Sequence, residues 1–170
     1  MQGLPVKEWR RGCFLLSTDV TLIDMEAVNS AFASDSMPWA VALPEDLLRT
    51  AINSSLCLGL YHCPNPDPQS KTTGRRMIGL VRVVTDFVTF GYVTDVYVLE
   101  EFRGLGLGKW MMECLGQYID QWPFLRRMLL LTITPKMAEL YKKNAGFVDF
   151  RESPSSDLIL LEKRGHGTRI

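Results

Sequence analysis

The hydrophobic and polar positions of the chain change period along its length, and these changes predict an ordered series of strands and helices. Short segments with alternating or continuous apolar residues indicate strands, and apolar residues that recur every three or four positions indicate amphipathic helices. The expected strands are residues 13–18, 56–61, 76–85, 87–98, 128–134 and 158–161, with residues 148–151 leading to the last of them. The expected helices are residues 19–34, 44–54, 109–122 and 136–145. A meander of strands that later alternates with helices indicates a mixed α/β sheet.

The segments between these elements indicate one domain that spans residues 1–170. Residues 62–75 are rich in Pro, Asn, Asp, Gln and Thr and lack periodicity, so we expect a long hairpin loop there. Residues 36–39 are expected to form a loop between the first two helices. The two ends, residues 1–10 and 163–170, are expected to be loosely held.

A glycine-rich run follows the strand pattern that ends at Val98. After two acids, residues 103–109 read Arg-Gly-Leu-Gly-Leu-Gly-Lys, and helical periodicity begins directly afterwards. The run therefore lies at a helix N-terminus, which presents unpaired backbone N–H groups and the positive end of the helix dipole. Gly104, Gly106 and Gly108 have no Cβ, so the backbone can approach a ligand closely. These features predict a main-chain site for a phosphate-bearing ligand.

The spacing of the glycines distinguishes between phosphate-binding motifs. The dinucleotide fingerprint would need glycine at Lys109, and the P-loop motif would need Ser or Thr at Trp110. The run instead fits R-x-x-G-x-G, and residues 140–147 read LYKKNAGF after a Thr-Pro pair that is typical of a helix start. Together these two elements resemble the GNAT superfamily of acyl-CoA-dependent N-acyltransferases. A tract that reads IGLVRVVTD before TDVYV resembles a subgroup of its small members.

The resemblance covers nearly the whole chain and implies both a fold and a cosubstrate. The implied fold is a single α/β (α+β) domain with a central mixed, mostly antiparallel twisted sheet and about four flanking helices. The implied cosubstrate is acetyl-CoA, with its pantetheine arm along the strand that ends at Val98 and its pyrophosphate on the glycine run. The residues expected around it are Val96, Tyr97, Val98, Arg103, Gly104, Leu105, Gly106, Leu107, Gly108, Lys109 and Thr134.

The resemblance also implies an acetyl transfer to a primary amine of a small molecule or peptide. The position of Tyr141 implies a general acid that protonates the leaving sulfur, although a half-buried aromatic on an amphipathic helix is the plain alternative. Asp95 is a carboxylate within a strand, where acids are disfavoured, and it is a candidate base. It could instead pair with Arg82 on a neighbouring strand, and Tyr92 or Thr94 could supply the base, in part through water. Strand alternation makes Asp95 and its neighbour Val96 face opposite ways unless a bulge intervenes.

The residues that bind the acceptor amine follow no recognisable motif in the sequence. The candidates are Trp39, Thr85, Asp86 and Phe90. Trp39 could equally be a hydrophobic lid residue, and Thr85 with Asp86 could form a turn. Two other classes of function stay open, a coenzyme A-binding sensor or partner module without turnover and an unrelated nucleotide-binding fold. Calorimetry with acetyl-CoA, NAD and ATP would distinguish them.

The amino-acid composition limits the partners, metal sites and cellular compartments that we expect for the protein. The chain has 170 residues, 46% of them apolar, with 19 basic and 19 acidic residues. Interspersed charges that sum to zero do not favour a nucleic acid or a membrane surface as partner. The sequence shows neither a membrane-length apolar run nor a signal peptide, and four cysteines without C-x-x-C spacing favour reduced thiols and no metal site. We therefore expect a cytoplasmic protein, with the nucleus left open, and homodimers are common among proteins that it resembles.

Overall fold

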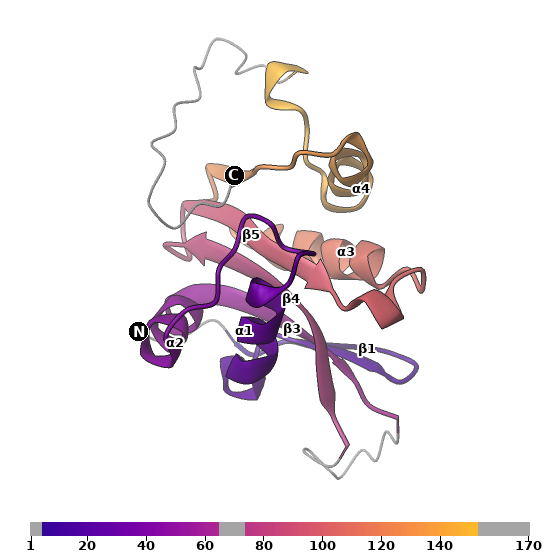
Figure 1. Ribbon diagram of the computed structural model, residues 1–170. Helices are drawn as coiled ribbons and strands as arrows, with labels where there is room; N and C mark the ends of the chain where they lie inside the picture. The colour runs from indigo at the N-terminus through magenta and orange to yellow at the C-terminus, as the bar shows by residue number, and fades with distance from the viewer. Residues whose placement is uncertain (1–4, 65–73, 153–170) are drawn as a thin grey trace.

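The computed structural model describes residues 5–64 and 74–152. Within these residues the chain forms one sheet with the strand order β1-β2-β3-β4-β5-β6 (Figure 1). The strands are β1 (Glu8–Arg11), β2 (Phe14–Ser17), β3 (Ser55–His62), β4 (Arg76–Thr85), β5 (Phe90–Val98) and β6 (Arg127–Leu130). Neighbouring strands are antiparallel except β5 and β6, which are parallel. The expected mixed, mostly antiparallel sheet is confirmed.

Helices cover both faces of this sheet. They are α1 (Met25–Ala33), α2 (Glu45–Asn53), α3 (Leu107–Ile119) and α4 (Pro135–Ala145), with short 3₁₀ turns η1 (Val20–Leu22), η2 (Glu100–Phe102) and η3 (Phe150–Glu152). The single helix expected over residues 19–34 is therefore wrong in part. Asp19 and Asp24 each accept a hydrogen bond from a backbone N–H a few residues downstream, so each carboxylate starts a separate helical segment.

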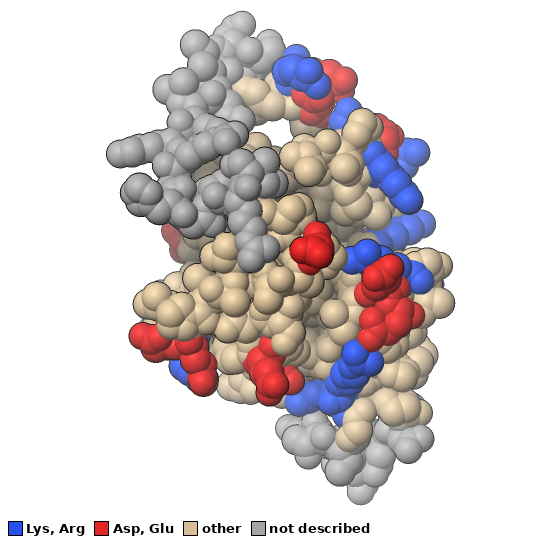
Figure 2. Space-filling view, viewed as in Figure 1, with Lys and Arg blue, Asp and Glu red and all other residues tan. Residues whose placement is uncertain are grey.

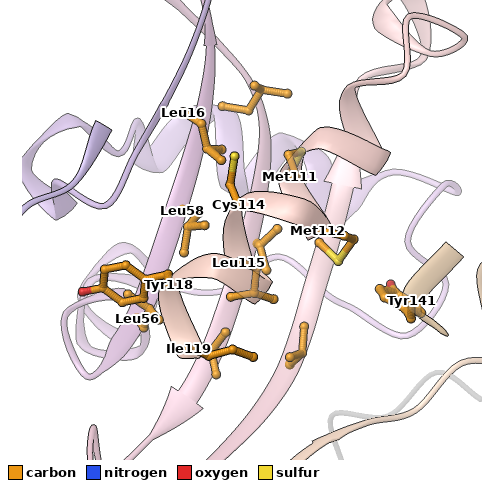
Figure 3. Close-up of a cluster of buried hydrophobic side chains, with 14 of the residues drawn as sticks. Leu16, Leu56, Leu58, Met111, Met112, Cys114, Leu115, Tyr118, Ile119 and Tyr141 are labelled. Carbon is orange, nitrogen blue, oxygen red and sulfur yellow. The ribbon is translucent and has the colours of Figure 1, made fainter. Parts of the chain in front are cut away.

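Two hydrophobic clusters lie on opposite faces of the sheet. One cluster joins α1 and α2 to the sheet and includes the fully buried Val28, Ile52 and Leu80. The other joins α3 and α4 to the opposite face, and Figure 3 shows its Met111 and Leu115 on α3 near Leu58 of β3. The alternating apolar positions of the strands are divided between these clusters, because successive side chains point to opposite faces.

Several boundaries differ from the sequence-based expectations. Residues 8–11 form an edge strand paired with β2, although residues 1–10 were expected to be loosely held. The expected strand over residues 128–134 ends at Leu130, α3 begins at Leu107 instead of Lys109, and residues 148–151 overlap the 3₁₀ turn η3. Most of the expected hairpin loop over residues 62–75, the last strand at 158–161 and the tail at 163–170 lie outside the described residues.

Acidic and basic side chains are interspersed on the face of the molecule shown in Figure 2, around a central area of uncharged side chains. Their even mixture agrees with the formal net charge of zero. Among the described residues, no helix combines the length and apolar character that a membrane span requires.

Candidate active site

The glycine run forms the turn between β5 and α3. Gly104 and Gly106 have φ values of +83° and +71°, in the left-handed region that glycine adopts most readily. Gly106 is the N-cap of α3 and provides no side-chain hydrogen bond, and the first turn of α3 contains no acidic residue. A Cβ at Gly104 or Gly108 would have no other atom within 4 Å. The turn therefore offers open backbone at a helix N-terminus, which can accommodate an anionic group.

The charged residues of the turn have different local partners. Arg103 Nε donates a hydrogen bond to the carbonyl oxygen of Val98, at 3.0 Å, which closes the turn onto the end of β5. Lys109 Nζ lies 3.5 Å from Glu113 Oε1 on the next turn of α3. Leu105 is 51% exposed, whereas Leu107 is buried in the core beneath α3. The sequence grouped these residues as one coenzyme loop, and the structure divides them between backbone support, surface and core.

The second half of β5 extends beyond its parallel partner. The paired residues of β5 and β6 run from Phe90 with Arg127 to Val93 with Leu130. Within the described residues, no strand pairs with the edge of β5 that continues past Val93 towards Val98. The backbone groups on such an edge are available to an extended ligand, which can bind as an added strand does.

The side chains of this half of β5 alternate between the two cores. Val96 and Val98 pack against the cluster beneath α3, and Tyr97 belongs to the cluster beneath α1 and α2. The three residues expected at the coenzyme thus line different faces of the sheet. Only Val96 and Val98 direct their backbone groups to the free edge, because alternate residues of a strand face opposite edges and the backbone of Tyr97 faces β4.

Tyr141 is held on α4 by features that the sequence predicted. Thr134 is the N-cap of α4, with Oγ1 accepting from the backbone N–H of Met137 at 3.4 Å, and Gly146 ends the helix in the left-handed conformation. The Tyr141 ring is 7% exposed and packs edge-on against Phe147, with 6.2 Å between ring centroids. Burial raises the pKa of its hydroxyl, so the phenol stays protonated well into the alkaline range.

A close approach between helices fixes the position of α4. A Cβ built on Gly116 of α3 would lie 3.4 Å from the Cα of Ala145 on α4. Figure 3 shows Tyr141 set apart from the side chains of α3, on the far side of Met112. Tyr141 belongs to the same buried cluster as α3, so its ring is part of the core as well as a candidate for chemistry.

Asp95 lies in a bulge and is paired with Arg82. Its φ is +46°, and its carboxylate Oδ2 accepts from Arg82 Nε at 2.6 Å. The Thr94 hydroxyl lies 3.3 Å from the other carboxylate oxygen. The alternative that Asp95 pairs with Arg82 therefore describes the observed geometry, and the bulge leaves Asp95 and Val96 facing opposite cores. Tyr92 and Thr94, the other candidate bases on β5, are half-buried.

The acceptor candidates are only partly brought together. Thr85 and Asp86 form the turn between β4 and β5, in which Thr85 donates to the carbonyl of Phe90. The Asp86 carboxylate accepts from the Thr89 hydroxyl and from the backbone N–H groups of residues 88–90, and these hydrogen bonds hold its pKa well below the usual range. The side chains of Thr85 and Asp86 therefore stabilise the turn through their hydrogen bonds. Phe90 at the start of β5 and Trp39 between α1 and α2 are 39% and 40% exposed.

Sequence reasoning missed Arg11. This residue ends β1, and its Nη1 donates to the carbonyl oxygen of Gly106 at 3.4 Å. No local pattern could have revealed this contact, because the two residues are 95 positions apart. Among the described residues, no group of three or more His, Cys, Asp or Glu side chains could hold a metal ion.

Comparisons with known proteins agree with this architecture. Residues 45–147 match the family model described as the acetyltransferase (GNAT) family. A Gibberella zeae protein that carries a provisional acetyltransferase name is 45% identical over 153 residues, which cover 86% of this chain and 85% of the relative. A crystal structure of a Xanthomonas campestris protein, provisionally assigned to the same family, superimposes with a TM-score of 0.67. The two chains are 30% identical, and the match covers 91% of this chain and 94% of the other.

The chain belongs to the GNAT family of acetyltransferases. Proteins of this family use acetyl-CoA as the acetyl donor, and this chain is an acetyltransferase by the same evidence. The microcin C7 self-immunity acetyltransferase MccE, solved in complex with acetyl-CoA and AMP, shares the fold with a TM-score of 0.52 at 11% identity. That match covers 81% of this chain and 79% of the other.

Proposed function

We propose that the protein transfers an acetyl group from acetyl-CoA to a primary amine of a small molecule or peptide, by direct attack of the amine on the thioester. The observation that carries this proposal is the free edge of β5, which runs from Val93 past Val98 into the uncapped N-terminus of α3. An extended arm joined to a pyrophosphate matches that sequence of binding groups. The edge offers backbone partners along the strand, and the turn offers backbone N–H groups to an anion.

Individual residues fit parts of the coenzyme. The backbone of Val96 and Val98 would pair with the pantetheine arm, and the N–H groups of residues 103–109 would hold the pyrophosphate. The open space above Gly104 and Gly108 supports this fit, because a Cβ there would project into it. Thr134 and the start of α4 would form the opposite wall.

The chemistry needs a positioned thioester, stabilisation of the oxyanion and a proton for the leaving thiolate. The amine nitrogen forms a bond to the acetyl carbon, the carbon–sulfur bond breaks and the amine loses a proton. A backbone N–H of residues 96–98 would donate to the oxyanion. Tyr141 would give its proton to the departing sulfur, and the raised pKa of its hydroxyl keeps that proton in place at neutral pH.

The candidate residues for the acceptor amine lie around the start of β5 and between α1 and α2. Trp39 and Phe90 are exposed aromatics that could contact the acceptor, and Thr85 and Asp86 would act there mainly by shaping the turn that carries Phe90. The amine must lose a proton before or during attack. Asp95, a water molecule, Tyr92 or Thr94 could accept it, and an amine with a low pKa could react without a protein base.

The first experiment is a thermal-shift titration with acetyl-CoA and coenzyme A, followed by measurement of thiol release with a panel of primary amines. A ligand at a hundred times its Kd that binds only the folded state adds about 2.7 kcal/mol to the free energy of unfolding. Stabilisation together with amine-dependent thiol release supports the proposal. Stabilisation without release from any amine favours a coenzyme A-binding sensor, and no stabilisation by either ligand contradicts the proposed coenzyme site.

A further inference from the structure

The backbone of β5 carries an extra residue where it faces β4. Arg82 pairs with Thr94, and Leu80 pairs with Tyr97, so Val81 alone faces both Asp95 and Val96. This is a β-bulge, and Asp95 is its inserted residue, since Val81 and Val96 share the core beneath α3. The φ of +46° at Asp95 is uncommon for a residue with a Cβ, so its surroundings must hold it in place.

A hydrogen-bonded network holds Asp95 in this conformation. Arg82 Nε donates to Asp95 Oδ2 at 2.6 Å, and Arg82 Nη1 donates to Ser55 Oγ at 3.1 Å. Ser55 in turn donates to the carbonyl oxygen of Ala51 in α2, at 2.7 Å. The Arg82 and Asp95 side chains are only 18% and 7% exposed, so water screens their interaction weakly. The network ties α2, β3, β4 and β5 together at one point.

This point lies next to the place where β5 leaves β6. The last parallel pair is Val93 with Leu130, and the bulge begins directly after Thr94. A bulge bends its strand and increases its twist. The inserted residue therefore sets both the direction of the free β5 edge and the orientation of the N–H groups at Asp95 and Val96.

We infer that the Arg82–Asp95 ion pair is a positioning device for the thioester, and that Asp95 acts as a positioning residue and not as the proton acceptor. This inference rests on the proposed function. Both carboxylate oxygens of Asp95 already have hydroxyl or guanidinium partners. The side chain also faces Arg82 on the side of the sheet that α2 covers, while Val96 and Val98 face the opposite core, so the carboxylate acts on the coenzyme edge through the backbone.

A double-mutant cycle with Arg82→Met, Asp95→Asn and the double variant tests this inference. Asparagine tolerates positive φ and keeps an oxygen for Arg82, and the double variant removes both buried charges and guards against a fold lost to one unpaired charge. The measurements are the Kd of acetyl-CoA by calorimetry, kcat with an active amine, and hydrogen exchange of the amides of residues 94–98. Arg49→Gln, which removes an exposed ion pair with Glu45 on α2, is the control.

The positioning role predicts that each single variant raises the Kd and lowers kcat by roughly tenfold, because a misplaced thioester is bound and attacked poorly. The double variant is then no worse than either single variant, exchange at residues 94–98 becomes faster, and Arg82→Lys recovers part of both constants. A base role predicts instead that Asp95→Asn lowers kcat alone, by about a hundredfold or more, while Arg82→Met stays near wild type.

The pattern expected for a base role, or additive losses in the double variant, overturns the inference. Failure of the inference is distinguishable from failure of the proposed function, because in the latter case the wild-type protein neither binds acetyl-CoA nor releases thiol. Hydrogen exchange then still reports whether the ion pair holds the bulge. Unchanged exchange in all three variants would show that it does not.

Discussion

The side chain of Arg11 donates a hydrogen bond to the carbonyl oxygen of Gly106, with 3.4 Å between the two atoms, and so joins the N-terminal hairpin to the turn that starts α3. Both Nη atoms of Arg11 would lie 3.7 Å from a Cβ at Gly106. Among the described residues, Arg11 forms no ion pair with a carboxylate, and the first turn of α3 contains no acid. A cation is thus held beside a positive helix terminus, an arrangement that a phosphate group would stabilise.

Replacement of Arg11 by Gln should therefore raise the Kd of acetyl-CoA by about tenfold and weaken its dependence on salt concentration, because one charge-assisted contact is lost. Calorimetry at two salt concentrations measures both effects. Arg10→Gln is the matched control, since Arg10 precedes it on β1 and pairs with Glu8 at 3.6 Å. Equal affinity of wild type and Arg11→Gln would show that the guanidinium only supports the turn.

Substitutions of Gly106 and Gly108 separate the conformation of the turn from its contact with the coenzyme. Gly106→Ala places a Cβ on a left-handed residue, so we expect it to lower the free energy of unfolding by about 1 kcal/mol and to weaken coenzyme binding. Gly108 lies within α3, where alanine favours the helix by up to about 1 kcal/mol. Gly108→Ala should therefore fold at least as well as wild type but bind acetyl-CoA more weakly. Unchanged affinity in this variant would place the coenzyme away from the turn.

Tyr141→Phe should lower kcat by about a hundredfold while the Kd of acetyl-CoA stays close to that of wild type. Phenylalanine keeps the ring that packs against Phe147 and removes only the hydroxyl. Tyr118→Phe is a suitable control, because Tyr118 is also buried and packs edge-on against Trp9 and Trp122, but it lies on α3. A change in affinity alone would make Tyr141 a wall of the binding site instead of an acid.

The contact of α3 with α4 predicts a size limit at Gly116. A Cβ there would lie 3.4 Å from the Cα of Ala145, so Gly116→Ala should fold normally. Gly116→Leu should lower the free energy of unfolding by about 1–3 kcal/mol, because its side chain would push α4 away. Since α4 carries Tyr141, the leucine variant should also lose kcat at temperatures where it remains folded. Urea denaturation and steady-state kinetics measure the two effects, and a leucine variant as stable as wild type would contradict this packing.

Alkaline pH should destabilise the fold through its buried thiols. Burial raises the pKa of Cys57 from 9.0 to about 12 and that of Cys114 to about 11. Above the unfolded-state pKa the folded state binds more protons than the unfolded state, so the free energy of unfolding falls as pH rises. Their contribution is complete below about pH 9 and is lost as pH rises to about 12. Urea denaturation across this range measures the loss, and a Cys57→Ala, Cys114→Ala double variant should lose part of the slope.

The elements that local chemistry determines were predictable from the sequence. The strand bounds of β4 were predicted residue for residue, and α4 was predicted with its Thr134 cap and Gly146 stop. The glycine turn was predicted because a strand pattern, three alternate glycines and a helix pattern adjoin one another along the chain. Asp19 and Asp24 show the limit of this reasoning, because helical periodicity spans both caps and gives no sign of the break between them.

The family, the order of most elements and the glycine turn at the start of α3 could be predicted from the sequence, because these depend on periodicity, caps and motif spacing within short segments. The contacts between residues far apart in the chain could be read only from the folded structure. Arg11 reaches Gly106, Gly116 sets the approach of α4, and Arg82 holds the bulge at Asp95. Each of these contacts depends on how strands and helices pack across the sheet, and the energies of such contacts leave no periodic pattern along the chain.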